Sequence, residues 1–472
     1  MNLHNLTIQK VHQGFAHKEF SCEELTRTHI ARIQERQPRI NAFITLSEEL
    51  ALAQAQEVDA RLRAGKPLRA LEGVPCAIKD AILVKGVRAT AGSKILEQYT
   101  ASYDATVVTR LKEAGAVILG KTNMDEFAMG SSGETSAYGV TRNPHDETRV
   151  PGGSSAGSAA CVADDQAVFA LGSDTGGSIR QPASFCGITG FKPTYGAVSR
   201  SGLIAMASSL DQIGPFAKTV EDAQVVFNVI AGKDPLDSTT IDLKAAHSEQ
   251  KIKNLRVGVP KEYFIDGMDK EVETVVRRAI AFLEAEGAKV EEVSLPLSPY
   301  ALAVYYILMP GEVSANLARF DGIRYGTPAA ANDLLDLYCA TRGTQFGAEA
   351  RRRIMLGTYV LSAGYRDAYY KQAQKVRVLI AQEFETMFQK VDVLITPTSP
   401  TPAFRFGEKA ADPLTMYLSD IFTVSANVGG IPGLSLPCGT SQGLPVGLQL
   451  LGARGDDARL LSLGTMVQNM LH

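Results

Sequence analysis

The sequence predicts an α/β sandwich around a largely parallel β-sheet. Two observations predict it. Short β-like runs alternate with helical segments from residue 73 to residue 174, and the same alternation returns over residues 255–295. No internal repeat, low-complexity tract or linker interrupts the chain, so we expect a single domain over residues 1–472.

The first part of that domain, residues 1–66, is expected to be a helical segment packed on the core. Ser21 and Glu24 have the spacing of a capping box in front of an apolar-periodic run. The run 48–65 is rich in Ala, Glu and Leu and ends at Gly65, as a strong helix does. No residue of this segment suggests chemistry.

The middle part, residues 67–230, carries the motifs of a candidate site. Its expected strands are 74–80, 116–121 and 166–171, and its expected helices are 105–115 and the alanine-rich 154–164.

The last part, residues 231–472, is expected to complete the sheet and to add a helical substrate-pocket region. The expected elements are the strand 255–260, the helix 271–288, the strand 288–295, a helical region 300–388, the strand 392–397, and two strands at 431–439 and 443–452 joined by a Gly-containing turn.

Composition limits the function. The chain has 48 basic and 51 acidic residues and a formal net charge of −3, which gives no broad surface for nucleic acid. Six scattered cysteines without a C-x-x-C pair argue against a disulfide framework and a zinc knuckle, so we expect no metal site. The N-terminus lacks the apolar region of a signal peptide and no run is long enough to span a membrane, which predicts a cytoplasmic protein.

The first chemical signal is Gly172–Gly187, GSDTGGSIRQPASFCG, which follows the expected strand 166–171. Two glycines let backbone N–H groups converge on one point, and Ser178 follows them as a nucleophile beside its own oxyanion hole would. A turn in which the serine caps a helix is the alternative.

Such a serine needs a base, and histidine is the usual one. Four of the seven histidines lie in the helical N-terminal segment, and only His145 lies near the glycine-rich region. There is also no G-x-S-x-G elbow around Ser178. Lys79, at the end of an apolar run, can serve instead if burial lowers its pKa. The alternatives are pairing with Asp80 or a side chain that reaches solvent.

A second glycine-serine loop, PGGSSAG, opens onto the alanine-rich segment and contains Ser154. It lacks the G-K-[ST] ending of a phosphate loop. A helix cap or an anion cradle would explain it, but its hydroxyls could also bridge a lysine amine to a second serine.

Together, Lys79 in GVPCAIKD, Ser154 in PGGSSAG and Ser178 in GSDTGGSIRQPA resemble the Ser-Ser-Lys triad of the amidase signature family, over nearly the whole chain. The resemblance implies a large central mixed, mostly parallel twisted sheet with helices on both faces. It makes Ser178 the acylated nucleophile, Ser154 the proton shuttle with a cis peptide bond, and Lys79 the neutral base. The implied oxyanion hole is formed by the N–H groups of Thr175, Gly176, Gly177 and Ser178.

Within that family, four runs resemble the glutamine-hydrolysing subunits of tRNA-dependent amidotransferases more than general amidases. They are 121–139, 318–326, 352–377 and 420–439. This implies hydrolysis of L-glutamine and delivery of ammonia to a partner in a heterotrimer with B and C subunits. A partner subunit would be the main binding site of the mischarged tRNA, use ATP and Mg²⁺, and amidate Glu-tRNA(Gln), with Asp-tRNA(Asn) left open as a second substrate. No cofactor would be bound by this chain.

A free amino acid requires a cation for its α-carboxylate and an acid for its α-ammonium. The resemblance assigns these to Arg353 and Asp420, with Ser131 and Tyr306 as further pocket residues. A solvated helix face would explain Arg353 as well, and core packing or a turn would explain Tyr306 and Ser131.

Two other functions stay open at this point. A stand-alone amidase would hydrolyse a small amide with the same triad and would not need Arg353 or Asp420. A catalytically idle scaffold would use the fold only to hold a transferase together.

Overall fold

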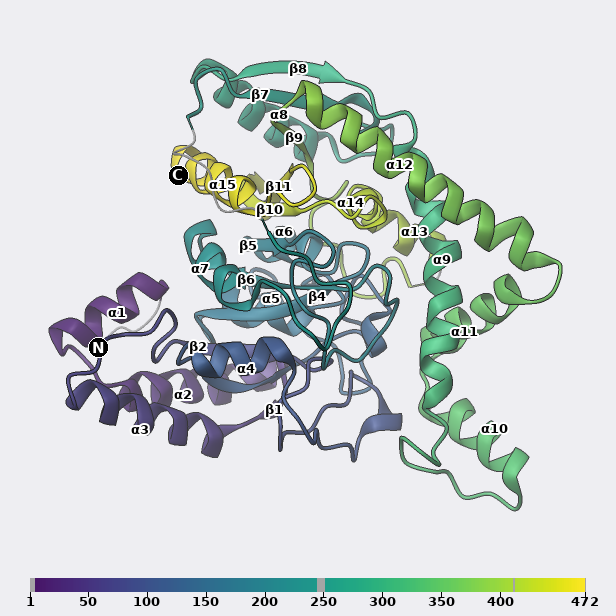
Figure 1. Ribbon diagram of the computed structural model, residues 1–472, viewed down its shortest axis with the longest axis horizontal. Coiled ribbons are helices and arrows are strands. Elements are labelled where there is room, and N and C mark those ends of the chain that lie inside the picture. The colour runs from purple at the N-terminus through teal and green to yellow at the C-terminus, as the bar shows by residue number, and fades with distance from the viewer. Residues whose placement is uncertain (1–4, 244–250, 411, 472) are drawn as a thin grey trace.

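The computed structural model describes residues 5–243, 251–410 and 412–471. Its centre is one sheet of 11 strands in the order β1-β3-β2-β4-β6-β5-β10-β11-β9-β7-β8 (Figure 1). The strands are β1 (Phe43–Leu46), β2 (Pro75–Lys79), β3 (Val117–Thr122), β4 (Phe169–Asp174), β5 (Thr189–Lys192), β6 (Gln212–Ala217), β7 (Arg256–Pro260), β8 (Lys289–Val293), β9 (Val393–Pro397), β10 (Gly433–Ser441) and β11 (Leu444–Leu451).

Helices surround this sheet. They are α1 (Ile8–His17), α2 (Cys22–Ile40), α3 (Glu48–Arg63), α4 (Thr106–Glu113), α5 (Ala156–Ala163), α6 (Arg180–Cys186), α7 (Val220–Ile230), α8 (Lys270–Ala285), α9 (Ala301–Asn316), α10 (Leu334–Gln345), α11 (Ala348–Leu361), α12 (Lys371–Lys390), α13 (Pro413–Tyr417), α14 (Val424–Val428) and α15 (Asp457–Leu471). Helix α7 packs against both α4 and α15, α5 packs against α6, and α9 packs against α11 and α12. The predicted α/β fold with a large mixed sheet is confirmed.

The prediction that the sheet is mostly parallel is wrong. In the described part of the chain, six of the ten neighbouring strand pairs are antiparallel. The parallel pairs are β2 with β3 and β4, and β7 with β8 and β9. These lie in the two regions where the sequence alternates between strand and helix. The central strands β5, β6, β10 and β11 are antiparallel to their neighbours.

The N-terminal capping box is confirmed. Ser21 Oγ accepts from the Glu24 N–H at 3.1 Å, and Glu24 Oε2 accepts from the Ser21 N–H at 2.7 Å. This pair satisfies two of the N–H groups that a helix start leaves free, so α2 begins where the sequence predicts it.

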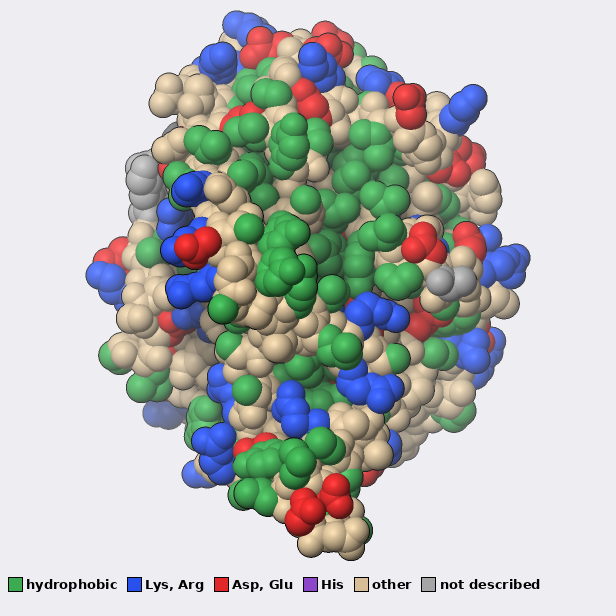
Figure 2. Space-filling view, turned by 90° about the vertical axis from the view of Figure 1, so that its right-hand side faces the viewer, with side chains coloured by type: hydrophobic (Ala, Val, Ile, Leu, Met, Phe, Trp, Pro, Cys, Tyr) green, Lys and Arg blue, Asp and Glu red, His purple; other side chains and the backbone are tan. Residues whose placement is uncertain are grey.

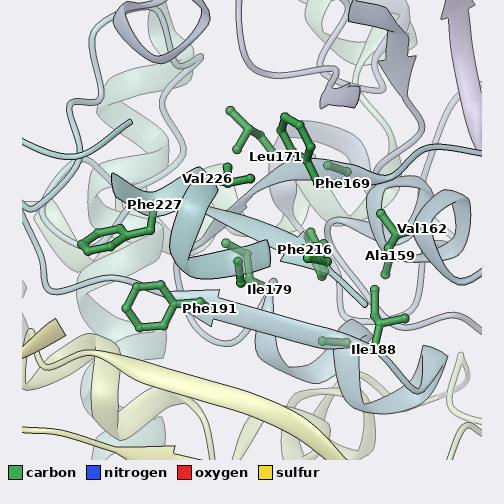
Figure 3. Close-up of a cluster of buried hydrophobic side chains, with 14 of the residues drawn as sticks. Ala159, Val162, Phe169, Leu171, Ile179, Ile188, Phe191, Phe216, Val226 and Phe227 are labelled. Atoms are coloured by element: carbon green, nitrogen blue, oxygen red, sulfur yellow. The ribbon is translucent and has the colours of Figure 1, made fainter. Parts of the chain in front are cut away.

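Ile179, the residue that follows Ser178, is buried among the apolar side chains of the core (Figure 3). It packs on the sheet at β5 and β6, where a Cβ on Gly190 would lie 3.1 Å from Ile179 Cγ2 and a Cβ on Gly214 would lie 3.1 Å from Ile179 Cδ1. Burying an isoleucine contributes roughly 1.5–3 kcal/mol, so Ile179 anchors the segment that carries Ser178.

None of the helices in the described ranges is long and apolar enough to cross a membrane.

Candidate active site

Lys79 lies at the end of β2, in the interior of the sheet. The strand is buried along its whole length and pairs with β3 on one side and β4 on the other. The Lys79 ammonium donates to Ser154 Oγ at 2.8 Å, to Ser155 Oγ at 2.9 Å and to the Ser173 carbonyl at 3.3 Å. All three acceptors are uncharged, so none of them neutralises the lysine. The alternative that Lys79 pairs with Asp80 is therefore wrong.

Burial decides the charge of this lysine. It lowers the pKa of Lys79 to about 7, although the carboxylates of Asp125, Asp174 and Asp211 act in the opposite direction. A neutral amine is therefore accessible near neutral pH, and only a neutral amine can accept a proton. Asp80 instead accepts from Lys121, at 3.4 Å, which leaves Lys79 to the serines.

Ser154 lies in the loop before α5, and its peptide bond with Gly153 is cis. Two contacts hold this loop. The Gly153 N–H donates to Gln181 Oε1 at 3.0 Å, and the Ser154 carbonyl accepts from the Asp125 N–H at 3.1 Å. A Cβ on Gly153 would lie 2.1 Å from Asp125 Oδ2, so this position requires glycine.

Asp174, the last residue of β4, organises the loop that carries Ser178. Its carboxylate accepts from the Gly177 N–H at 2.8 Å and from the Ile179 N–H at 3.1 Å. Burial alone would raise the pKa of Asp174, but the Arg180 guanidinium holds it below its ordinary value. The loop is therefore wrapped around a buried anion.

Arg180, which balances that anion, is itself buried and ties the loop to the C-terminal part of the chain. Its guanidinium donates to Asp174 Oδ2 at 3.1 Å, to the Thr423 carbonyl at 2.9 Å, to Asn427 Oδ1 at 2.6 Å and to Gln449 Oε1 at 2.8 Å. A buried guanidinium is tolerated when an acceptor and a counter-charge face its N–H groups, and these contacts supply both.

Ser178 has the properties of an available nucleophile. Its side chain is 8% exposed, and within the described chain Ser178 Oγ has no hydrogen-bond partner. The structure brings Lys79 and Ser154 into contact, whereas a hydrogen bond from Ser154 to Ser178 stays a prediction.

The expected oxyanion hole needs one correction. The Gly177 N–H points to Asp174, so this geometry does not offer it to an oxyanion. The N–H groups of Thr175, Gly176 and Ser178 have no acceptor among the described residues and stay candidates. Thr175 is held by its hydroxyl, which donates to Asp211 Oδ1 at 2.7 Å.

The predicted pocket residues come together in two contacts. Ser131 Oγ donates to Asp420 Oδ2, while Asp420 Oδ1 is buried and has no hydrogen-bond partner among the residues that the structure describes. Burial raises the pKa of Asp420 to about 7, and the nearby Arg353 acts against this rise. Arg353 Nε donates to Glu349 Oε1 at 2.7 Å, and its guanidinium lies 5.5 Å from the centroid of the Tyr306 ring.

Arg353 is 3% exposed, so the solvated helix face that would explain it otherwise is excluded. Together with Ser131, Arg352 and Tyr417 it lines a cavity of about 350 Å³. Tyr306 stacks on Tyr417 with ring centroids 3.9 Å apart, so it packs against the cavity wall.

Sequence reasoning missed Tyr305. Its ring occupies the space beside Gly176, where a Cβ would lie 2.8 Å from the ring. Tyr305 and Tyr306 are neighbours on α9, and no pattern distinguishes the one that faces the loop. Ser155, Asp174 and Asp211 were missed too, because a single buried polar residue at the end of a strand or beside one leaves no periodic signal.

Replacing Gly177 with Ala should damage this loop. The residue has φ +143°, and a Cβ would lie 2.1 Å from Thr423 Oγ1. We expect destabilisation by about 1–3 kcal/mol and at least a tenfold loss of turnover, measured by thermal unfolding and amide hydrolysis. Gly267 (φ +88°, no atom near its Cβ) is the matched control, and an equally inactive Gly267→Ala would contradict the argument.

Within the described ranges, no three His, Cys, Asp or Glu side chains come together as metal ligands would.

Comparison with known proteins agrees with this geometry. The family model described as Amidase matches residues 24–461. The chain is 56% identical to the A subunit of glutamyl-tRNA(Gln) amidotransferase from Carboxydothermus hydrogenoformans, over 98% of this chain and 96% of that protein. Among solved structures, the A subunit of the same enzyme from Thermotoga maritima matches at 43% identity with a TM-score of 0.81, covering 98% and 94% of the two chains.

A second solved structure, the peptide amidase from Stenotrophomonas maltophilia, matches at 30% identity with a TM-score of 0.84, covering 98% and 96% of the two chains. The family model covers most of the chain, and the relatives cover nearly all of it. The chain therefore belongs to the amidase signature family.

Proposed function

We propose that this chain is the glutamine-hydrolysing subunit of a tRNA-dependent amidotransferase, with Ser178, Ser154 and Lys79 as its catalytic triad. The observation that carries the proposal is the Lys79 amine, buried and hydrogen-bonded to Ser154 Oγ at 2.8 Å. A lysine with a pKa of about 7 in an uncharged hydroxyl environment is suited to accept a proton from a serine.

The chemistry then proceeds in two stages. Ser178 Oγ attacks the side-chain amide carbon of L-glutamine, and its proton passes through Ser154 to the Lys79 amine. The N–H groups of Thr175, Gly176 and Ser178 stabilise the oxyanion; loss of one such donor typically costs about 2.7–4 kcal/mol of barrier. The intermediate collapses, Lys79 returns the proton to the leaving nitrogen, and ammonia departs. Water then hydrolyses the γ-glutamyl ester by the same route.

We assign recognition of the glutamine α-carboxylate and α-ammonium groups to two charged side chains beside the cavity, Arg353 and Asp420. Arg353 would bind the α-carboxylate, and Asp420 would accept from the α-ammonium through its unpartnered Oδ1. A buried oxygen without a partner is costly, so a ligand that donates to it is favoured. Ser131 orients Asp420, and Tyr306 lies against Arg353.

The partners follow from the names of the relatives. The A subunits of glutamyl-tRNA(Gln) amidotransferase from two bacteria, Carboxydothermus hydrogenoformans and Thermoanaerobacter pseudethanolicus, are 56% and 53% identical to this chain. We infer that ammonia passes to a B subunit in a heterotrimer with a C subunit. The B subunit would use ATP and Mg²⁺ to amidate Glu-tRNA(Gln), and amidation of Asp-tRNA(Asn) stays open. No cofactor is assigned to this chain, and a cytoplasmic location stays a prediction.

Asp420→Asn should separate this function from that of a stand-alone amidase. The substitution removes a buried anion and keeps an acceptor for Ser131. We expect kcat/KM for L-glutamine to fall on the order of 30-fold or more, since truncating a buried charge pair costs about 2–5 kcal/mol. Hydrolysis of propionamide, which has no ammonium group, should change little.

The assay is ammonia release by the purified chain, alone and with its B and C subunits. Rapid hydrolysis of propionamide with no turnover of glutamine in either setting would favour the stand-alone amidase. Equal losses on both substrates in Asp420→Asn would remove Asp420 from recognition of the ammonium group.

A further inference from the structure

One stretch of the surface is unusually apolar. Among the described residues, thirteen of the eighteen large hydrophobic side chains that are exposed lie between Ile323 and Leu418, a fifth of the chain. Figure 2 shows this side of the molecule, where hydrophobic side chains form a broad band with Lys and Arg side chains beside and below it. Exposed apolar patches of this kind mark interaction sites.

The centre of this surface is a set of side chains that we call the α11 patch. Its members are Met355, Leu356, Tyr359, Tyr365 and Tyr369, which are 72%, 44%, 49%, 42% and 42% exposed. The Tyr359 and Tyr365 ring centroids are 4.3 Å apart, and those of Tyr365 and Tyr369 are 6.1 Å apart. Met355 and Leu356 lie four and three residues before Tyr359 on α11, so they share its face.

The patch is not required by the packing of α11. The opposite side of the helix carries Arg353 and packs on α9, where a Cβ on Gly357 would lie 1.8 Å from the Pro310 carbonyl oxygen. Tyr365 directly precedes the π-helical turn Arg366–Tyr370, and Tyr369 lies within it. This form of helix often occurs at functional sites. One side of α11 therefore serves the candidate active site, and the other faces solvent with apolar groups.

The charges around the patch indicate its occupant. From residue 351 to residue 375 there are six basic residues and a single acidic one, Asp367, in a chain whose net charge is −3. Of the basic residues only Arg353 is buried. A surface complementary to the patch would be apolar at its centre and acidic at its rim, as in a protein interface. RNA would use the basic side chains but leave Met355 and Leu356 in water.

We propose that the α11 patch is the docking surface for the protein that receives ammonia, through an apolar, acid-rimmed surface of that partner. The inference rests on the proposed function and adds the place of contact. The run 352–377, which resembles amidotransferase subunits more than general amidases, carries the whole patch. The cavity lined by Arg352 and Arg353 lies at the same helix, so a partner seated here is next to the site of ammonia release.

The test uses Met355→Glu and Tyr359→Glu, made in the full chain together with the B and C subunits of the same organism. Each variant places a charged side chain in the apolar centre of the interface, where its burial without a partner is costly. We expect at least a tenfold weaker association, measured by sedimentation or calorimetry, with unchanged thermal unfolding and unchanged hydrolysis of propionamide by the isolated chain. Phe282→Glu, at a 40% exposed position on α8, is the matched control and should associate normally.

A charge-reversing variant adds an independent arm. Lys375→Glu should weaken association more at low salt than at high salt, because rim charges are screened. Normal association of both Met355→Glu and Tyr359→Glu would overturn the proposal. Normal association combined with a loss of tRNA binding would assign the patch to RNA instead. If even the unaltered chain forms no complex while it hydrolyses glutamine, the docking proposal fails and the glutaminase chemistry stands.

Discussion

Replacing Ser178 with Ala is expected to abolish glutamine-dependent amidation of tRNA by the assembled enzyme, with a fall on the order of 10⁴-fold or more. Ser178 is 8% exposed and its Oγ has no hydrogen-bond partner among the described residues, so its loss removes the nucleophile and breaks no contact of that oxygen. Free ammonia should still support the reaction, because the partner's chemistry does not pass through this serine. The measurement is amidated tRNA formed with glutamine and with ammonium chloride.

Each result of that experiment decides between functions. Unchanged activity with glutamine would make the chain a scaffold. If ammonium chloride failed to restore activity, the division of labour between two subunits would be wrong. A folded variant is expected because Ile179, not Ser178, anchors the loop in the core (Figure 3).

Replacing Lys79 with Ala should damage hydrolysis nearly as much, because residues that act as a unit are not additive. The pH dependence gives the sharper measurement. Lys79 must be neutral to accept the proton, and its pKa is lowered to about 7. In the unaltered chain kcat/KM should therefore be low in acid, half-maximal near pH 7 and level above it. The residual activity of Lys79→Ala should lack this step.

Lys192 provides the matched control. It is also buried, burial and the nearby Arg180 lower its pKa to about 7, and it donates to the carbonyls of Pro193 and Ile431. It touches neither Ser154 nor Ser178. Lys192→Met should change thermal stability and leave the pH step in place. If the pH step vanished in Lys192→Met but survived in Lys79→Ala, the assignment of Lys79 as the base would be wrong.

The sequence predicts those parts of the fold whose signals are local. The two regions around β2–β4 and β7–β8 follow from alternating apolar runs, and the start of α2 follows from Ser21 and Glu24. The central strands β5 and β6 are short and contain Gly or Pro, so they give no clear pattern. The pairing of β5 with β10 also joins residues about 240 positions apart, which one sequence does not reveal.

The candidate site divides in the same way. Loops rich in Gly and Ser identify Ser154 and Ser178, and an apolar run identifies Lys79. The contact of Asp211 with Thr175 joins residues in different loops, and that of Asp174 with the Gly177 N–H depends on the exact path of the backbone. The assignment of Gly177 to the oxyanion hole failed for this reason, since a glycine-rich sequence does not tell where each N–H points.

The contacts of Arg180 have a consequence for synthesis on the ribosome. The guanidinium that balances Asp174 needs Gln449, which lies 269 residues later in the chain. A nascent chain that already contains all three triad residues still lacks this acceptor, and the loop around Ser178 is held by an incompletely satisfied buried charge. We therefore expect the site to reach its final form only after the last strand, β11, has been synthesised and has paired.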